Sequence, residues 1–367
     1  MNLPGRRTLS LLLGLLAAAS AWALDPTRGL SQYHHKAWTV ADGMPADIRA
    51  ITQGPNGYLW LGTVNGLYRF DGVKVERMAA ELLPSPSIRT LTTTPGGGLW
   101  IGYERPVGLI SYLEGGVLKN YPIEGPSTTR IIQVELGPDG TQWAATPEAV
   151  FRFTGGRWEA MQSDWGTSMG LAPGGVLAFA VGRDGTVWSK NLLGLYYLRP
   201  GTERFVQARA FAGGPEAFMK SPDGTLWTTD VERGQLYALP ELAAVSGPEP
   251  APAKFGAKVP HALQGPILLD RHGSLWCASL EDGGVCRIRG SGHSESTTAR
   301  PGRFDLYTTR DGLSSNQIHS LFEDREGNIW VGTSLGLDRF RPANVVSEGQ
   351  VPAGFQSRFV EATPGVI

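Results

Sequence analysis

Two arginines and a histidine occupy one recurring position in this sequence. Arg49, Arg89 and His319 each lie 11 residues before a tryptophan, and each directly follows an isoleucine. If the isoleucine packs inside the protein, alternation along a strand turns the next side chain to the opposite face. A guanidinium offers a planar fork of donors, so the three residues predict a site for an anionic or hydroxyl-rich ligand, such as a carboxylated glycan or a peptide carboxyl terminus. The alternative is that the arginines only line a wet channel and pair with nearby carboxylates.

The other chemistry-bearing residues do not form a catalytic pattern. The six histidines have no metal-ligand spacing, and neither a serine nucleophile elbow nor a dinucleotide-binding motif can be read. Most aspartates and glutamates stand in turns, where hydrogen bonds to nearby backbone explain them. We therefore predict a non-enzyme that uses no metal and no cofactor. The alternatives are an exported lyase or glycan-cleaving enzyme and an interaction scaffold, because fold alone does not decide function.

The sequence holds only two cysteines, Cys277 and Cys286. They are symmetric about Glu281 and Asp282, so a two-residue turn there would bring them opposite each other on paired strands. An oxidising compartment would permit a disulfide, and two free, half-buried thiols are the alternative. The spacing fits neither a zinc site nor a redox CxxC motif.

The elements that must position these residues are repeats anchored by tryptophan. Residues 58–72 read as two short strands joined by a tight turn, and they return almost unchanged at residues 328–340. Five weaker copies lie between them, and successive anchoring tryptophans are 39 to 54 residues apart. Repeats of this size built from short strands are typical of a β-propeller, so we predict an all-β, seven-bladed propeller. The seven tryptophans are Trp60, Trp100, Trp143, Trp188, Trp227, Trp276 and Trp330.

An extra strand near the N-terminus predicts how the ring closes. Residues 304–313 lead into the last repeat, and residues 36–44 match them although no repeat precedes this early copy. We expect residues 33–40 to supply the outer strand of the seventh blade, which leaves no open sheet edge. Residues 240–260 hold several prolines, and we expect them to form an extended connection between the fifth and sixth blades.

The N-terminus has the pattern of a secretory signal peptide. Arg6 and Arg7 precede an apolar run over residues 9–19, and Ala21-Trp22-Ala23 offers small residues where a signal peptidase reads them. We predict a signal peptide over residues 1–23 and a periplasmic location. An uncleaved membrane anchor is the alternative, although the run is shorter than the ~20 residues of a spanning helix. We expect no later membrane span, and a net charge of −1 gives no reason to expect nucleic acid as a partner.

The remaining chain divides into two parts. The propeller is expected over residues 24–342. Residues 343–367 read as a linker and the start of a further repeat that stops before its tryptophan. We therefore expect the chain to be the first part of a longer protein or a truncated gene product.

Two repeats carry a family resemblance. Residues 42–70, which begin Asp42-Gly43-Met44, and residues 311–340, which begin Asp311-Gly312-Leu313, resemble the two-component regulator propeller repeat. In that family, exported propellers form periplasmic sensor regions, usually followed by a small β-sandwich, a membrane helix and a cytoplasmic histidine kinase or diguanylate cyclase. The resemblance implies a periplasmic sensor for a small ligand, such as an oligosaccharide or a peptide, or for a protein partner. No kinase or cyclase motif can be read in this chain, so the signalling role rests on the resemblance.

Overall fold

The computed structural model describes the fold over most of the chain. The predicted signal peptide at residues 1–23 and the further repeat at residues 343–367 lie outside the described residues and stay predictions. The described residues are 29–30, 33–104, 108–123, 130–163, 176–191, 193–208, 215–230, 235–245, 253–258, 263–279, 283–288 and 304–342.

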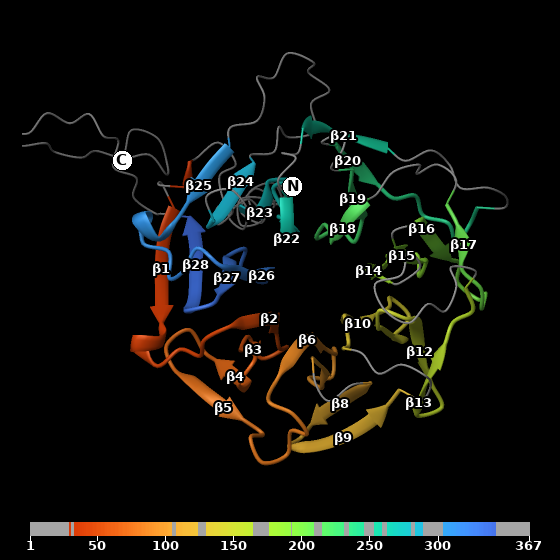
Figure 1. The fold of residues 1–367 in the computed structure, drawn as a ribbon, viewed down its shortest axis with the longest axis horizontal. Coiled ribbons are helices and arrows are strands. Elements are labelled where there is room, and N and C mark those ends of the chain that lie inside the picture. The colour runs from red at the N-terminus through yellow and green to blue at the C-terminus, as the bar shows by residue number, and fades with distance from the viewer. Residues whose placement is uncertain are drawn as a thin grey trace, which may run out of the picture.

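Within these residues, seven four-stranded antiparallel sheets surround a central axis (Figure 1). The predicted all-β, seven-bladed propeller is therefore confirmed. Blades 1 to 3 consist of β2 (Ile48–Gln53), β3 (Leu59–Thr63), β4 (Gly66–Phe70) and β5 (Val75–Met78), then β6 (Ile88–Thr93), β7 (Leu99–Tyr103), β8 (Leu109–Glu114) and β9 (Val117–Pro122), then β10 (Gln133–Leu136), β11 (Gln142–Ala145), β12 (Val150–Thr154) and β13 (Arg157–Ala160).

The other four blades follow the same order from the axis outward, except that the last one takes its outer strand from the N-terminus. Blades 4 to 7 consist of β14 (Ala178–Val181), β15 (Val187–Asn191), β16 (Gly194–Leu198) and β17 (Val206–Gln207), then β18 (Pro215–Lys220), β19 (Leu226–Asp230), β20 (Gln235–Ala238) and β21 (Ala253–Lys258), then β22 (Leu263–Leu269), β23 (Leu275–Ser279), β24 (Val285–Ile288) and β25 (Phe304–Tyr307), and finally β26 (Ile318–Glu323), β27 (Ile329–Thr333), β28 (Gly336–Pro342) and β1 (Tyr33–Thr39).

The predicted closure of the ring by the N-terminal strand is confirmed. β1 pairs antiparallel with β28 along its whole length, from Tyr33 opposite Pro342 to Thr39 opposite Gly336. Trp38 stacks on Trp330 with 5.6 Å between ring centroids, so the closing strand also shares the core of the last blade. Two 3-10 turns, η2 (Val40–Asp42) and η3 (Thr309–Asp311), occupy matching positions after the two outer strands that the sequence identified as copies.

The core lies mainly between neighbouring blades, as the repeated tryptophans require. Trp38 and Trp330 of blade 7 pack with Leu61 and Phe70 of blade 1 in one buried cluster. The blades approach so closely that a side chain on Gly62 would place its Cβ 2.6 Å from Cγ2 of Ile88. Glycine is therefore needed after the tryptophan because no bulkier residue fits between the blades.

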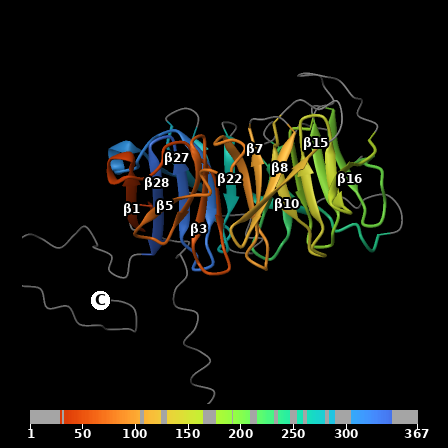
Figure 2. The ribbon, with the colours of Figure 1, turned by 90° about the horizontal axis from the view of Figure 1, so that it is seen from below.

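The strands stand across the thickness of the ring, as the side view shows (Figure 2). Because the strands of a blade alternate in direction, each inner strand begins on the face where the second and third strands are joined. Backbone bonds confirm this: Glu104 N–H donates to Ser87 at 2.9 Å, and Ser334 N–H donates to Gln317 at 3.1 Å. We call this side the mouth face, defined by the residues that precede the inner strands.

One prediction about the rim was wrong. Residues 240–260 were expected to be only an extended connection, but they contain β21 (Ala253–Lys258), which pairs with β20 as the outer strand of blade 5. Prolines at positions 248, 250 and 252 precede the strand and so do not interrupt its ladder. An outer strand tolerates weak β-forming sequence because only one of its edges is paired.

Candidate functional site

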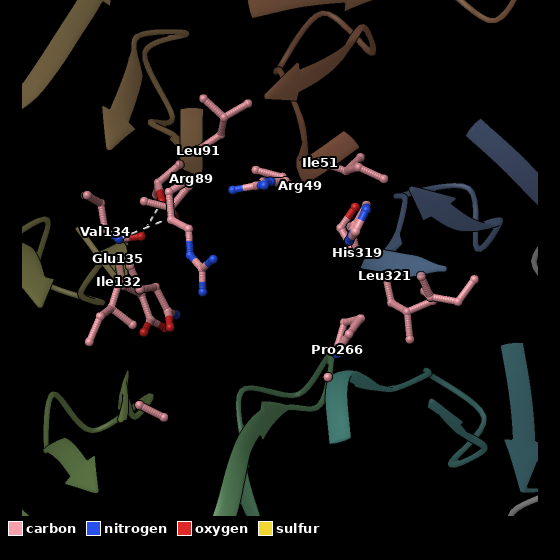
Figure 3. Close-up of a pocket in the computed structure, with 18 of the residues that line it drawn as sticks. Arg49, Ile51, Arg89, Leu91, Ile132, Val134, Glu135, Pro266, His319 and Leu321 are labelled. Carbon is pink, nitrogen blue, oxygen red and sulfur yellow. Dashed lines mark hydrogen bonds between the residues drawn. The ribbon is translucent and has the colours of Figure 1, made fainter. Parts of the chain in front are cut away.

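The candidate site is a cavity of about 820 Å³ on the axis of the ring. Its wall comes from the inner strands of several blades, and Figure 3 shows their side chains around one open centre. The three residues singled out from the sequence, Arg49, Arg89 and His319, all line it. We call these three the basic arc. Their role in binding a ligand stays a prediction, but the structure brings them together at one cavity.

A β-bulge positions each residue of the basic arc. Ile48 pairs with Thr63 and Ala50 with Gly62, so Arg49 between them has no partner across the ladder. The same irregularity recurs around Arg89 and around His319. A bulge re-aims a side chain relative to the regular pleat. Simple strand alternation predicted that these side chains face the cavity, and the bulge leaves each of them without a partner across the ladder.

A carboxylate that the sequence analysis missed lies between the two arginines. Oε2 of Glu104 is 3.9 Å from Nη1 of Arg49 and 3.5 Å from Nη1 of Arg89. This oxygen is buried and has no hydrogen-bond partner among the described residues. An alignment of the repeats could have identified this residue. Glu104 follows Gly102-Tyr103 at the position where the two well-matched repeats have Val64 and Ser334.

The charges around Arg89 do not balance. Burial lowers the pKa of the Arg89 guanidinium, and the carboxylate of Glu104 opposes that shift. Repulsion from Arg130 and Arg49 lowers this pKa further. Arg89 therefore has two positive charges and one carboxylate near it, and arginine stays protonated in proteins, so the charges around Arg89 keep a positive excess.

His319 is held from the neighbouring blade. Its Nε2 lies 3.2 Å from Oδ1 of Asp47, the residue just before β2. Asp47 has a left-handed backbone, with φ of 51°, and its N–H donates to the Ser334 carbonyl at 3.1 Å. Aspartate is one of the few non-glycine residues that adopt this conformation readily. The pair links blade 7 to blade 1 at the mouth.

The next two blades carry aliphatic residues at the same strand position, and the polar Gln133 and Glu135 of blade 3 line the cavity beside them. Ile132 in blade 3 and Leu177 in blade 4 also lie 11 residues before their tryptophans, and both line the cavity. We call these two residues the apolar arc. Leu177 remains 48% exposed, which leaves apolar surface facing the cavity. Gly265 and Pro266 of blade 6 complete the wall without adding charge.

A second ion pair lies toward the other end of the inner strands. Glu135 of β10 accepts a hydrogen bond from the Val181 backbone N–H at 3.0 Å and pairs with the ammonium of Lys220 in β18. Both carboxylate oxygens are therefore occupied from within the protein. The pair ties blade 3 to blade 5 across blade 4.

The two cysteines lie opposite each other in blade 6. Cys277 of β23 is in register with Cys286 of β24, and the structure joins them by a disulfide with 5.0 Å between Cα atoms. Both are fully buried. Neither cysteine lines the cavity, so the disulfide contributes to the blade rather than to the site.

No other cluster with metal or membrane chemistry is found in the part of the chain that the structure describes. No group of three or more His, Cys, Asp or Glu residues there could hold a metal ion. His261 and His293 lie outside the described side chains. None of the described helices is long and apolar enough to cross a membrane.

The fold and this cavity define the molecule as a seven-bladed β-propeller with a polar axial channel. Residues 312–334 match the family model described as a two component regulator propeller. The predicted resemblance to the two-component regulator propeller repeat family is thus confirmed, with the match in the repeat that leads into blade 7. No curated protein matches the chain significantly.

Solved structures share the fold at low sequence identity. A streptogramin B lyase is 12% identical with a TM-score of 0.64, over 86% of this chain and 99% of that one. The extracellular domain of the putative hybrid two component system BT3049 from B. thetaiotaomicron is 16% identical with a TM-score of 0.60, over 85% of this chain and 42% of that one. YCF48 bound to D1 peptide is 15% identical with a TM-score of 0.57, over 91% of this chain and 100% of that one. These likenesses establish the propeller fold, which serves unrelated functions.

Proposed function

We propose that this chain is the exported sensor propeller of a signalling protein and that it binds an anionic ligand in its axial cavity. The observation that carries the proposal is the basic arc, in which three neighbouring blades turn Arg49, Arg89 and His319 into one cavity. A cavity of about 820 Å³ suits a small-molecule ligand. The two-component regulator repeat at residues 312–334 supports the sensor role.

The charge balance of the arc favours an anion. The distances from Glu104 to Arg49 and Arg89, 3.9 and 3.5 Å, exceed the ~2.7–2.9 Å of a charge-assisted hydrogen bond. The two guanidinium forks therefore keep donors that a ligand carboxylate can use at shorter range. Planar bidentate recognition of this kind is the interaction for which arginine is better suited than lysine.

Binding is favoured over catalysis by how the other ionisable groups are paired. His319 faces Asp47, and Lys220 faces Glu135, so each of these two basic side chains lies beside a carboxylate of the protein itself. The extracellular domain of a putative hybrid two component system is among the propellers of similar fold, which is consistent with an input domain for a kinase or cyclase.

A lyase is the second candidate, and one observation favours it. His319 beside a carboxylate has the composition of a general base, and a streptogramin B lyase shares the fold. The purified protein would then turn over cyclic peptides or glycans, and His319→Ala would abolish the turnover. Saturable binding without turnover would leave the sensor as the function.

Under this proposal the propeller is periplasmic. Residues 1–23 would be removed as a signal peptide, residues 24–342 would form the propeller, and residues 343–367 would lead to further repeats and an output domain. Mass spectrometry of the mature N-terminus tests the location, and an intact Met1 on a cytosolic protein would contradict it.

The site is tested with the double variant Arg49→Ala/Arg89→Ala. We expect a loss of about 1–3 kcal/mol of unfolding free energy, because the buried oxygen of Glu104 loses both neighbouring positive charges, while binding of carboxylated oligosaccharides and peptides is lost. The control is Arg157→Ala, because Arg157 lies on an outer strand with a 75% exposed side chain. Unchanged binding in the double variant would show that the ligand site lies elsewhere.

A further inference from the structure

The strand position that carries the basic arc changes character around the ring. It holds Arg49, Arg89 and His319 in blades 1, 2 and 7, and Ile132 and Leu177 in blades 3 and 4. Blade 6 has Gly265 there, and the side chain of the blade 5 residue, Glu216, lies outside the described ones. At this strand position the cavity is therefore charged in blades 7, 1 and 2 and aliphatic in the neighbouring blades 3 and 4. A ligand that fills it meets both surfaces at once.

The apolar arc is not explained by packing alone. Ile132 is partly buried against the core between blades 3 and 4, but nearly half of the Leu177 surface remains exposed. A half-exposed leucine gains stability only when another apolar group covers it, since the gain follows the apolar area removed from water. Such a residue at the mouth of a binding cavity contributes to affinity and not to folding.

From this two-sided wall we infer that the ligand is a carboxylate joined to an aliphatic group, with the carboxylate on Arg49 and Arg89 and the aliphatic group against Ile132 and Leu177. The inference rests on the proposed anion site and names its ligand class. A short peptide with an apolar C-terminal residue has this chemistry, and so does a medium-chain fatty acid. A uronic-acid oligosaccharide fits less well, because its hydroxyls would lose water against the aliphatic side chains of Ile132 and Leu177.

Four probes separate these classes in a calorimetric titration. They are N-acetyl-leucyl-leucine, the same dipeptide as its C-terminal amide, octanoate, and a trimer of galacturonate. We expect the dipeptide acid or octanoate to bind more tightly than the galacturonate trimer. We expect the amide to bind at least about tenfold more weakly than the acid, since a neutral amide cannot form the bidentate ion pair that a carboxylate forms with a guanidinium. The dipeptide and octanoate arms distinguish a peptide source from a lipid source.

Two leucine variants test the apolar arc directly. Leu177→Asn should weaken binding of the tightest-binding probe about tenfold, because the ligand then covers less apolar surface. It should also make the heat-capacity change of binding less negative, because that change reports buried apolar surface. Leu193→Asn is the control, since Leu193 is equally exposed in the same blade but does not line the cavity. It should leave affinity unchanged.

The outcomes distinguish this inference from the proposed function. If Arg89→Gln weakens binding but Leu177→Asn changes affinity by less than about twofold, the anion site stands and the apolar half of the ligand is wrong. Tight binding of galacturonate alone would overturn the inference in the same way. If the wild type binds none of the four probes, or binds them equally after Arg89→Gln, both the inference and the anion site fail.

Discussion

Blades 7, 1 and 2 and blades 3 and 4 are built from one repeat but differ at its inner strand. In the first group the strand carries a bulge, and the bulged residue is Arg49, Arg89 or His319. In the second group the inner strand pairs without irregularity, and the residue before it is aliphatic. The comparison teaches that the repeat fixes which strand position faces the axis, with or without a bulge, while the residue type at that position decides its chemistry.

The two groups also differ in how they are held together. Blade 7 is completed by the N-terminal strand and shares a stacked pair of tryptophans with it. Asp338 in this blade is fully buried and lies 2.8 Å from His35 of the closing strand. Blade 4, by contrast, ends in an outer strand of only two residues, β17 (Val206–Gln207). The basic arc therefore includes the one blade that the N-terminal strand completes.

Deleting residues 24–41 should cause the largest loss of stability among these tests. The deletion removes β1 and Trp38, unpairs β28 and exposes the core between blades 7 and 1. We expect a loss of several kcal/mol, since truncation of a single buried tryptophan already costs about 3–5 kcal/mol. Thermal and urea unfolding measure it, with Val73→Ala as a control because Val73 is 87% exposed. An unchanged melting temperature would show that the ring does not close in this way.

Replacing one tryptophan in blade 7 and one in blade 5 tests whether all blades contribute equally to stability. Trp330 is buried, stacks on Trp38 and donates its indole N–H to Asp324 at 2.7 Å, whereas Trp227 in blade 5 is only partly buried. Trp330→Ala should cost about 3–5 kcal/mol of unfolding free energy, and Trp227→Ala clearly less. Equal losses in urea titrations would mean that all blades contribute alike to stability.

Reducing the disulfide should have an intermediate effect, confined to blade 6. The bond between Cys277 and Cys286 closes a short loop across one hairpin, and the chain-entropy model gives about 2–3 kcal/mol for a loop of this size. We expect no free thiols in the unfolded, unreduced protein and a lower melting temperature after reduction. A Cys277→Ala/Cys286→Ala variant should not respond to the reductant. Two titratable thiols would show that the bond does not form.

The sequence was sufficient for the fold because its signal is local and repeated. Within each repeat, tryptophan, glycine and turn residues stand at the same relative positions. The outer strand at residues 33–40 follows no repeat, so it had only one blade to complete. The outer strand β21 was missed because the prolines before it made the whole stretch read as a connection, although the strand itself follows them and pairs along one edge. A single repeat could not have revealed either the bulges or the partners that cross between blades.

The site was predictable in part for the same reason. Arg49, Arg89 and His319 stand at the same distance before their tryptophans, and this shared strand position, which can be read from spacing alone, brings them to one cavity. Glu104 and Asp47 were not predicted, because each acts on a residue of another strand or blade that only the closed ring brings near. Arg287 is a similar case: it is fully buried in blade 6, and its guanidinium lies 4.9 Å from the Tyr33 ring of the closing strand.

The smallest expected effect concerns His272, which stands in the turn of blade 6 where blade 1 has Asn56. Burial lowers the pKa of the His272 imidazole, and the charges of Arg271 and Arg287 add to this shift while Asp270 opposes it. Its Nε2 is buried without a hydrogen-bond partner among the described residues. The folded protein therefore binds this proton less readily than the unfolded chain does.

The sign of the pH dependence follows from that difference. Above the usual histidine pKa of about 6.5 both states are neutral and His272 has no effect, and below it the unfolded chain takes up the proton first. Stability should thus fall slightly as the pH drops from about 7.5 to 5.5. His272→Asn should fit the turn, because asparagine tolerates turn geometry, and it should remove the part of the pH dependence of stability that His272 causes.

The pKa of His34 is also lowered, mainly by burial, so the measurement is the difference in unfolding free energy between wild type and variant in urea titrations across this range. If the two pH profiles run parallel, His272 keeps its ordinary pKa in the folded protein and the turn of blade 6 is as well solvated as its counterpart in blade 1.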